Sequence, residues 1–375
     1  MTYSPQFSPQ DHAYMRQALE LASCATMATS PNPKVGCVLV KEGEVIGQGW
    51  TQPVGQAHAE VMALRDAAAQ GNSVQGATAY VTLEPCSHFG RTPPCANALI
   101  DAGLARVVAA IEDANPQVAG RGFAMLRDAG IVVEHGLLAA EAREMNVGFF
   151  KRMETGRPWV RLKMAASLDG FTALPNGQSQ WITDAAARED GHRWRARADA
   201  ILTGIGTVLA DDPQLTVRLP GGDAALTHQP RKIILDTQLR TPIGAKLFQS
   251  GSVTIFHATK NAEREKALQS SGAQLQYLPD DLSATSSQVN LIEMMQVLGR
   301  EQVNELHIEA GAKLSGALIQ AGCVDELLLY LAPKLLGRGA SMFALPELQK
   351  VDEARSLIIH EMCQVGDAIR VLARF

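Results

Sequence analysis

The sequence has few aromatic residues, no long run of one charge and no apolar stretch of membrane length. Only 5% of its 375 residues are aromatic, and the formal net charge is −5. Nucleic-acid surfaces need clustered cations, so an acidic chain without a basic and aromatic stripe disfavours that function. No apolar run approaches the roughly 20 residues that a membrane span requires. We therefore expect no nucleic-acid partner and no membrane partner.

Cysteines and targeting signals are also scarce. Six cysteines in a chain of this length do not form a disulfide framework, which predicts a reducing compartment. The segment Met1-Thr2-Tyr3-Ser4-Pro5 has neither a charged region nor an apolar core like those of signal peptides. We therefore expect a cytoplasmic location. The length and the 46% hydrophobic content allow two domains, each with a sizeable core.

A candidate metal site lies in the first third of the chain. His58, Cys86 and Cys95 can hold Zn²⁺ and leave a fourth position for water, as catalytic zinc sites do. Glu60 lies two residues after His58, where a carboxylate can move protons to and from that water. The H-x-E…P-C pattern is the signature of zinc nucleobase deaminases, but residues 87–94 separate the two cysteines here, where that signature has two residues.

Other interpretations of this cluster stay open at this point. The same residues can be a buried imidazole and two core cysteines, and His88 can replace His58 as the ligand. A structural zinc site would need a fourth protein ligand and would leave Glu60 without a task. We interpret the remaining cysteines as small core hydrophobes; they are Cys24, Cys37, Cys323 and Cys363.

Alternating extended and helical patterns predict two α/β domains, 1–150 and 151–375, because residues 151–158 are charged and contain Gly and Pro. In the first domain we expect helices at 11–29, 58–69, 96–102 and 122–129, and strands at 35–40, 45–49, 80–83, 107–111 and 131–134. In the second we expect strands at 160–164, 201–203, 232–235, 253–256, 274–278, 306–308, 326–331 and 369–374, and helices at 184–198, 262–270, 287–300 and 311–321.

Helix starts are expected to build the metal site. Residues two apart on a regular helix do not face each other, so His58 and Glu60 share a site if their helix begins at or just before His58. Cys95 follows two prolines and is expected to open a helix, whose N-terminus stabilises a thiolate.

Two patterns in the second half have both a functional and an ordinary interpretation. Gly311–Gly316 lacks the Lys-Ser/Thr of a P-loop, but it can feed a helix N-terminus that binds phosphate, or be a simple turn. Gly204-Ile205-Gly206 has two glycines of a dinucleotide fingerprint, with Leu209 in place of the third. A group of five arginines in the second half forms either a solvated helix face or a clamp for an anion. They are Arg188, Arg193, Arg195, Arg197 and Arg218.

Over nearly its full length the chain resembles the bifunctional riboflavin-biosynthesis deaminase/reductase family. The resemblance is carried by Pro31–Gly36, His58–Glu60 and Val81–Cys95, including the long insert between the cysteines. In the second half it is carried by Lys163–Gly170, Ser179–Thr183, Val208–Pro213, Glu309–Gly311 and Ala332–Gly337. The resemblance implies a cytidine-deaminase-like three-layer α/β/α domain followed by a dihydrofolate-reductase-like α/β domain.

The resemblance also implies two successive reactions and their site residues. Zinc-activated water would replace the 2-amino group of a diaminopyrimidinone that carries a ribosylamino 5′-phosphate, with Glu60 moving protons and Asn32 positioning the ring. NADPH would then reduce the ribosyl group to ribityl. The NADPH site would comprise Ala165, Trp181, Thr207, Asp211, Gly311, Ala312, Lys313, Leu314, Ser315, Gly316 and Ala317. The substrate of the reductase would contact Ser179, Arg195, Leu215, Arg218 and Glu309.

Several points remain open at the level of sequence. Lys163, Asp211 and Glu309 are candidates for the proton donor of the reduction. A preference for NADPH over NADH and assembly into a homo-oligomer rest on the resemblance. The rival hypotheses are a nucleic-acid base deaminase with an appended domain and a binding protein with a structural zinc.

Overall fold

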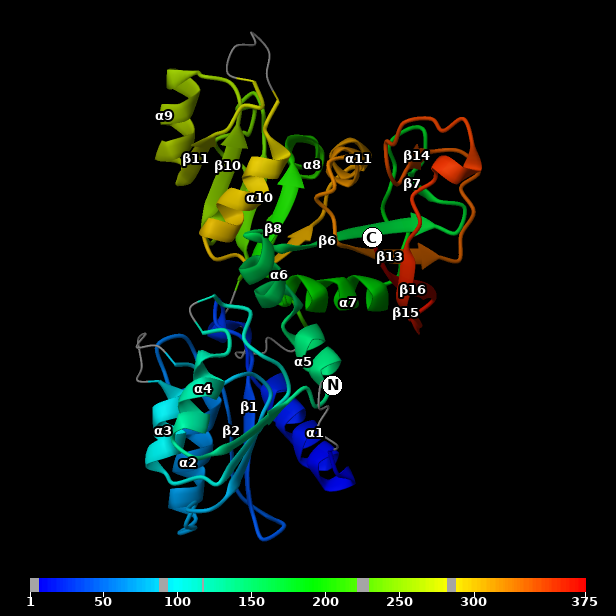
Figure 1. Ribbon diagram of the computed structural model, residues 1–375. Coiled ribbons are helices and arrows are strands. Elements are labelled where there is room, and N and C mark those ends of the chain that lie inside the picture. The colour runs from blue at the N-terminus through cyan, green and yellow to red at the C-terminus, as the bar shows by residue number, and fades with distance from the viewer. Residues whose placement is uncertain (1–6, 88–93, 117, 221–228, 282–287) are drawn as a thin grey trace. The chain divides into compact units, whose positions relative to one another are not determined.

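The computed structural model describes residues 7–87, 94–116, 118–220, 229–281 and 288–375 (Figure 1). The chain forms two compact units, Met1–Gly156 and Arg157–Phe375. The division follows α6 (Val147–Thr155), which ends at Gly156 in the left-handed conformation. The boundary expected at residue 150 falls inside this helix, whose buried residues Phe149 and Phe150 pack in the core of the first unit. The charged and glycine-containing segment that we used as a boundary signal begins within the helix.

The first unit has a five-stranded sheet in the order β2-β1-β3-β4-β5. Strands β3, β4 and β5 are parallel, and β1 is antiparallel to both of its neighbours. Its strands are β1 (Gly36–Lys41), β2 (Glu44–Trp50), β3 (Thr78–Val81), β4 (Arg106–Ala109) and β5 (Val132–His135). Its other helices are α1 (Pro9–Ser23), η1 (Met27–Thr29), α2 (Ala59–Ala69), α3 (Cys95–Asp101), α4 (Arg121–Asp128) and α5 (Ala139–Met145).

Helices cover both faces of this sheet. On one face α2, α3 and α4 bury small and apolar side chains against alternate strand residues such as Leu39 and Val107. On the other face α1 and α5 pack against Val38 and Val108, the neighbours of those residues along the strands. Successive strand side chains point to opposite faces, so a strand buried on both sides reads as a continuous apolar run. The expected three-layer α/β/α arrangement is therefore present in this unit.

Glycines let α2 approach β2 closely. A Cβ added at Gly47 or Gly49 would lie 2.5 Å from backbone atoms of Ala63. The facing side of α2 is correspondingly lined by the small residues Ala59, Ala63 and Ala67. This contact fixes where α2 begins, and His58 and Glu60 lie at that end.

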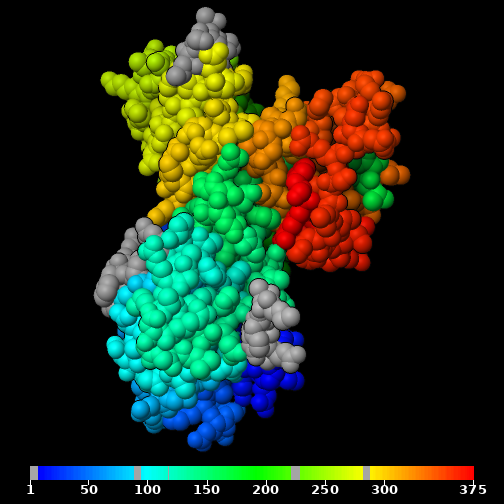
Figure 2. All heavy atoms as spheres, viewed as in Figure 1, coloured from blue at the N-terminus to red at the C-terminus, as the bar shows by residue number. Residues whose placement is uncertain are grey.

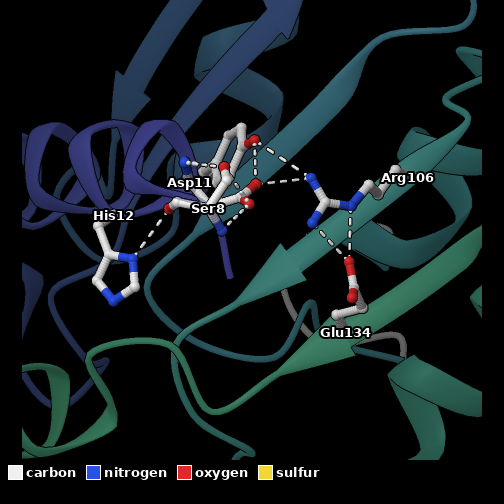
Figure 3. Close-up of polar contacts among 6 residues, drawn as sticks. Ser8, Asp11, His12, Arg106 and Glu134 are labelled. Atoms are coloured by element: carbon white, nitrogen blue, oxygen red, sulfur yellow. Dashed lines mark hydrogen bonds and ion pairs between the residues drawn. The ribbon is translucent and has the colours of Figure 1, made fainter. Parts of the chain in front are cut away.

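A buried polar network ties α1 to the sheet (Figure 3). The Asp11 carboxylate accepts hydrogen bonds from the hydroxyl of Tyr80 at 2.7 Å and from Arg106 Nη1 at 2.7 Å. Its other oxygen caps α1 by accepting the N–H and the hydroxyl of Ser8. Arg106 also pairs with Glu134 at 2.6 Å. Burial alone would raise the pKa of Asp11, but the bonds from Arg106, Ser8 and Tyr80 hold it well below its ordinary value.

Replacement of Asp11 by Asn should destabilise the first unit by about 2 kcal/mol, because Arg106 loses a charged partner in a partly buried site. A carboxyl whose pKa is lowered on folding stabilises above its unfolded pKa and loses that effect as the pH falls. The wild-type free energy of unfolding should therefore decrease below about pH 4, the unfolded value, and Asp11→Asn should weaken this decrease. Urea unfolding between pH 3 and pH 7 measures both effects, and equal pH profiles for the two proteins would contradict this account.

The second unit has a nine-stranded sheet in the order β11-β10-β9-β8-β12-β6-β13-β16-β15 and a small β14-β7 ladder. All pairings from β11 to β13 are parallel, and β16 and β15 are antiparallel additions at one edge. Its strands are β6 (Trp159–Ser167), β7 (Phe171–Ala173), β8 (Ala200–Gly204), β9 (Arg231–Leu235), β10 (Val253–His257), β11 (Ala273–Tyr277), β12 (Glu305–Ile308), β13 (Glu326–Ala332), β14 (Ala340–Ser341), β15 (Ile358–Val365) and β16 (Ala368–Arg374).

Helices flank this sheet as well. They are α7 (Ala185–Ala196), α8 (Ile205–Asp211), η2 (Lys246–Gln249), α9 (Ala262–Ser270), α10 (Leu291–Arg300), α11 (Ala312–Gln320) and η3 (Val351–Glu353). One face packs on α10 and α11 through Leu202 and Ile233, and the other packs on α8 and α9 through Ile201 and Ile234. Helix α7 packs separately on β13 and β16.

The strand order reverses direction at one place in this sheet. After β8 the chain continues to its neighbour β9, whereas after β12 it crosses over β6 to β13. In open parallel sheets, ligands bind outside the carboxyl ends of the strands at such a reversal. Strand β8 ends at Gly204, the N-cap of α8, and the segment after β12 begins with Glu309, so both glycine patterns noted in the sequence lie here.

Some expected elements differ from the structure. The helix expected at 11–29 ends at Ser23, because Thr26 is extended and caps the separate turn η1. The helix expected at 287–300 begins at Leu291 with Asn290 as its N-cap; residue 287 lies outside the described residues. Elements that were not expected are α5, α6, α8, β7, β14 and β15, together with the short turns η1, η2 and η3.

Strand β15 is an exposed sheet edge. Ile358, Ile359 and Met362 are 75%, 63% and 66% exposed. Figure 2 shows this part of the chain as red spheres on the surface of the second unit.

Among the described residues, no helix is long and apolar enough to cross a membrane.

Candidate active sites

Two helix N-termini bring the three predicted zinc ligands together. His58 is the N-cap of α2, and its side chain makes no capping hydrogen bond. Cys95 is the first residue of α3, and Cys86 lies in the loop after β3. Glu60, in the first turn of α2, is only 4% exposed. The expectation that α2 begins at His58 and that Cys95 opens a helix is confirmed.

The distances in this cluster fit a tetrahedral zinc site. His58 Nδ1 lies 3.3 Å from Cys95 Sγ and 3.6 Å from Cys86 Sγ, and the three ligand atoms lie within 4.8 Å of one another. Zinc–sulfur and zinc–nitrogen bonds of about 2.3 and 2.0 Å place neighbouring tetrahedral ligands roughly 3.5–3.8 Å apart. Two thiolates and an imidazole therefore suit Zn²⁺, and three protein ligands leave a position for a water or a substrate.

The charges of the site favour metal binding and proton transfer. Hydrogen bonds from Cys95 and His58 lower the pKa of Cys86 to about 4, against the opposing effect of burial. The backbone N–H of Cys95 contributes by donating to Cys86 Sγ at 3.3 Å. Burial first, and then the charge of Cys86, raise the pKa of Glu60 to about 7. A carboxyl with a pKa near neutrality can both accept and donate a proton.

Glu84 has a supporting task that the sequence did not indicate. Its buried carboxylate accepts the N–H groups of Gly122 at 2.9 Å and Gly120 at 3.0 Å, and those of Asp113 and Phe123 at 3.2 and 3.3 Å. This holds the start of α4 against the Glu84–Cys86 loop. A Cβ at Gly122 would lie 2.0 Å from the Pro85 carbonyl oxygen, so the contact requires glycine. Glu84 therefore orients the Cys86 loop through the backbone.

The structure does not test the roles predicted for Asn32 and His88. Asn32 lies in the turn before β1, where its N–H donates to the Thr29 carbonyl at 2.9 Å. Among the described residues, no hydrogen bond joins its side chain to His58 or Glu60, so its role in positioning a ring stays a prediction. His88, the alternative ligand, lies outside the described residues.

The second unit contains two adjoining cavities at the carboxyl ends of its central strands. The cavity we call the glycine cavity has a volume of about 340 Å³, and the one we call the arginine cavity has about 580 Å³. They share Lys163, Trp181, Arg188 and Glu309. The glycine cavity also touches Ala165, Ser179, Thr207, Asp211, Gly311 and Ala312, and the arginine cavity touches His192, Arg195 and Arg218. Most of the predicted reductase residues therefore meet in one place.

In the glycine cavity, the start of α11 can bind a phosphate group of a ligand. Gly311 is the N-cap of this helix and has open space around the position of a Cβ. The first helical N–H groups, from Ala312 to Leu314, have no acceptor within a regular helix and can donate to an anion. The Ser315 N–H already donates to the Gly311 carbonyl at 3.1 Å.

Residues further along α11 serve packing. Ser315 is fully buried, and its hydroxyl donates to the Ala310 carbonyl at 3.2 Å. A Cβ at Gly316 would lie 2.2 Å from the Ala344 carbonyl oxygen, and Leu314 packs on Gly204. Lys313 and Ala317 are not among the residues that line the glycine cavity. The segment 311–317 thus combines an open helix N-terminus at Gly311 with tightly packed residues from Ser315 onward, and direct contact of each residue with the cofactor stays a prediction.

The arginine cavity is built around a bidentate ion pair. Arg195 Nε and Nη2 lie 2.9 Å from the two carboxylate oxygens of Glu309, and Arg195 Nη1 donates to the Thr216 carbonyl. Burial alone would raise the pKa of Glu309, but Arg195, His307 and Lys163 hold it well below its ordinary value. Glu309 is therefore ionised, and Arg195 is held rigidly at the cavity wall.

Leu215 does not line either cavity. It is 5% exposed and packs in the cluster with Ile205 and Val208. Its φ of +53° places it in the left-handed region, so it shapes the loop that carries Thr216 and Arg218. Ser179, expected at the substrate, lines the glycine cavity with the predicted cofactor residues.

Three charged or titratable wall residues were not among the predicted contact residues, although Arg188 belonged to the possible anion clamp and Lys163 to the candidate proton donors. Lys163 lines both cavities and lies against Gly191, whose added Cβ would be 3.9 Å from Lys163 Cε. Arg188 stacks on the Trp181 ring at 4.4 Å. His192 also lines the arginine cavity. Helical spacing could have indicated His192, since positions 188, 192 and 195 share one face of α7, but it could not have indicated Lys163 on β6.

The remaining cysteines lie outside both sites. Cys37 and Cys323 are buried, as expected for small core residues. The expectation was wrong for Cys24, which is exposed, and incomplete for Cys363, which is half-buried on the edge strand β15. Both positions belong to surfaces that the sequence pattern did not reveal, the end of α1 and the edge of the second sheet.

Comparison with known proteins matches both units to described families. Residues 8–111 match the cytidine and deoxycytidylate deaminase zinc-binding region, and residues 158–370 match the RibD C-terminal domain. The chain is 48% identical to the riboflavin biosynthesis protein RibD of Escherichia coli over 366 residues, which cover 95% of this chain and 97% of that protein. The chain belongs to the RibD family. It thus has a deaminase unit and a dihydrofolate-reductase-like reductase unit and takes part in riboflavin biosynthesis.

Other relatives agree with this assignment to the RibD family. The RibD protein of Haemophilus influenzae is 45% identical over 375 residues, 98% of each chain. A structure of Acinetobacter baumannii RibD superposes with a TM-score of 0.87 at 42% identity, covering 97% of this chain and 98% of that one. A Thermotoga maritima structure, described as a diaminohydroxyphosphoribosylaminopyrimidine deaminase/5-amino-6-(5-phosphoribosylamino)uracil reductase, has a TM-score of 0.84 at 31% identity over 97% of this chain and 98% of that one.

Proposed function

We propose that the chain first deaminates a diaminopyrimidinone that carries a ribosylamino 5′-phosphate and then reduces its ribosyl group to ribityl with NADPH. The cluster of His58, Cys86 and Cys95 beside buried Glu60 carries the first assignment. The two cavities that meet at Lys163 and Glu309 support the second. The Thermotoga maritima relative bears the names of both activities.

In the deaminase unit, His58, Cys86 and Cys95 would hold Zn²⁺, which lowers the pKa of a bound water and so supplies a nucleophile at neutral pH. Glu60 would carry one proton from the attacking water to the ring nitrogen. It would then carry a second proton from the new hydroxyl group on the ring carbon to the departing ammonia. Glu60 is almost completely buried in the first turn of α2, two residues after the proposed ligand His58, where such a proton carrier is needed. Glu84 would keep the Cys86 loop in register with the start of α4.

In the reductase unit, the glycine cavity would hold NADPH, with a phosphate at the start of α11. NADPH supplies a hydride, and the protein has mainly to orient the two reactants. The arginine cavity would hold the phosphorylated side chain of the substrate through Arg195 and Arg218, which suit bidentate binding of phosphate. Lys163 and Glu309 line both cavities, which supports a role for them between substrate and cofactor. Either one remains a candidate for handling the proton, and Asp211 is a third.

Arg218→Ala should weaken binding of the phosphorylated substrate by about 10–100-fold, because a charge-assisted contact to phosphate contributes roughly 1.5–3 kcal/mol. Steady-state oxidation of NADPH, with the deaminated substrate varied, measures this as a rise in KM. The KM for NADPH should stay unchanged, because Arg218 lines only the arginine cavity. An unchanged KM for the substrate would remove Arg218 from the phosphate site.

We also propose a cytoplasmic homo-oligomer. The described cysteines are free thiols, as a reducing compartment requires. The exposed edge of β15 carries Ile358, Ile359 and Met362, and an exposed apolar edge strand is prone to pair with another chain. A solution mass equal to one chain at micromolar concentration would contradict self-association.

A further inference from the structure

His192 lies in the arginine cavity beside the two arginines proposed to bind the substrate phosphate. It is on α7, four residues after Arg188 and three before Arg195, so these three side chains share one face of the helix. A single histidine on a helix is not by itself a signal for a site. Its position in this cavity and the hydrogen bond that its ring accepts determine the tautomer and the protonation state of the imidazole.

The backbone N–H of Arg218 donates to His192 Nδ1 at 3.2 Å. A ring nitrogen that accepts a hydrogen bond carries no proton, so the proton of the neutral imidazole is on Nε2. Nε2 has no hydrogen-bond partner in the described part of the chain. His192 therefore fixes the backbone of Arg218 on one side and keeps a free donor on the other.

Charged groups surround this imidazole on several sides. Its own helix contributes Arg188, Glu189 and Arg195, the loop contributes Arg218, β6 contributes Lys163 and the segment after β12 contributes Glu309. Burial first, and then Arg195 and Arg218, lower the pKa of His192 to about 4. The imidazole is therefore neutral near pH 7, and its Nδ1 stays available as an acceptor.

We propose that His192 is a positioning and specificity residue of the reductase reaction, which holds Arg218 through Nδ1 and donates Nε2–H to an acceptor oxygen of the phosphorylated side chain. This inference rests on the proposed reductase function. A neutral donor among cations adds a directed hydrogen bond without adding charge, whereas arginine supplies most of the attraction. Its effect should depend on the phosphate of the substrate.

The test compares His192→Ala, His192→Asn and His192→Gln in the full-length enzyme, with the deaminated substrate offered with and without its 5′-phosphate. His192→Ala should raise KM for the phosphorylated substrate by about 10-fold, with a smaller change in kcat. KM for the dephosphorylated substrate and for NADPH should change less than 2-fold by the same reasoning, within roughly 0.4 kcal/mol. His192→Asn, whose Oδ1 can accept the Arg218 N–H, should recover part of the loss.

Combination with Arg218→Ala separates positioning from general packing. Because His192 acts partly through Arg218, the losses from His192→Ala and Arg218→Ala should be less than additive in the double variant. The loss that His192→Ala still causes there measures the direct bond from Nε2–H. Arg193→Gln is the matched control, because Arg193 is on the same helix with a side chain that is 64% exposed. Three results would each overturn the proposal. They are equal losses for both substrates, additive effects in the double variant, and unchanged KM in all three His192 variants. An inactive wild-type reductase would instead contradict the proposed function itself.

Discussion

Glu60→Gln should reduce the rate of deamination by about 10²–10⁴-fold, the usual contribution of a positioned general acid–base group. The amide keeps the size of the side chain and cannot carry a proton between water, ring nitrogen and ammonia. Zinc content should remain near one ion per chain, because the predicted ligands His58, Cys86 and Cys95 are unchanged. Ammonia release and elemental analysis of the same preparation measure both quantities.

Two controls make the Glu60 experiment specific. Glu141→Gln replaces an exposed acid of the same unit and should leave both activities unchanged. In Glu60→Gln itself, the reductase should still act on substrate that is already deaminated, because its proposed site belongs to the other unit. Normal ammonia release by Glu60→Gln would remove Glu60 from the catalytic role. Loss of zinc together with activity would indicate that Glu60 supports the metal instead.

Glu309→Gln should reduce kcat/KM of the reductase by about 10²-fold, while ammonia release stays normal. The carboxylate forms a bidentate pair with Arg195 and lines both cavities. Its removal leaves a largely buried guanidinium, 12% exposed, without its partner, and breaking such a pair costs about 3–5 kcal/mol when both groups are buried. That cost concerns the stability of the fold. The 10²-fold loss in kcat/KM corresponds to about 2.7 kcal/mol of transition-state stabilisation and is expected because Arg195 is no longer held at the cavity wall.

The matched control for Glu309 is Glu301→Gln. Glu301 pairs with Arg231 at 2.9 Å at the surface, where an ion pair contributes little, so this variant should keep full activity. A Glu309→Gln enzyme with normal kcat/KM would show that the ion pair is dispensable for reduction. Thermal unfolding of the variant distinguishes a local effect on the cavity from loss of the folded unit.

Much of the zinc site could be predicted from the sequence because its geometry is local. The start of α2 at His58 was expected because His58 and Glu60 can then share a site, and the start of α3 at Cys95 because two prolines precede it. Both starts bring their side chains next to Cys86. The task of Glu84 could not be predicted. It depends on Gly120 and Gly122, which reach the carboxylate only once α4 is packed in place.

The reductase site depends on contacts between segments that are distant in sequence. Arg195 lies on α7 and Glu309 follows β12, 114 positions later, so they meet only in the folded unit. Edge strand β15 escaped prediction because it is exposed along most of its length and its register shifts between Ile359 and Glu361, so it has no alternating apolar pattern. Helix α8 has seven residues, too few to show a helical period.

Product mass is the most direct measurement of the central claim. Zinc-loaded protein would be given the diaminopyrimidinone ribosylamino phosphate, once without NADPH and once with it. We predict a gain of about one mass unit without the cofactor and about two more with it, as expected when oxygen replaces an amino group and a hydride reduction follows. Deamination without reduction would contradict the assignment of the second unit to this substrate. An unchanged mass in both reactions would contradict the proposed substrate for both units.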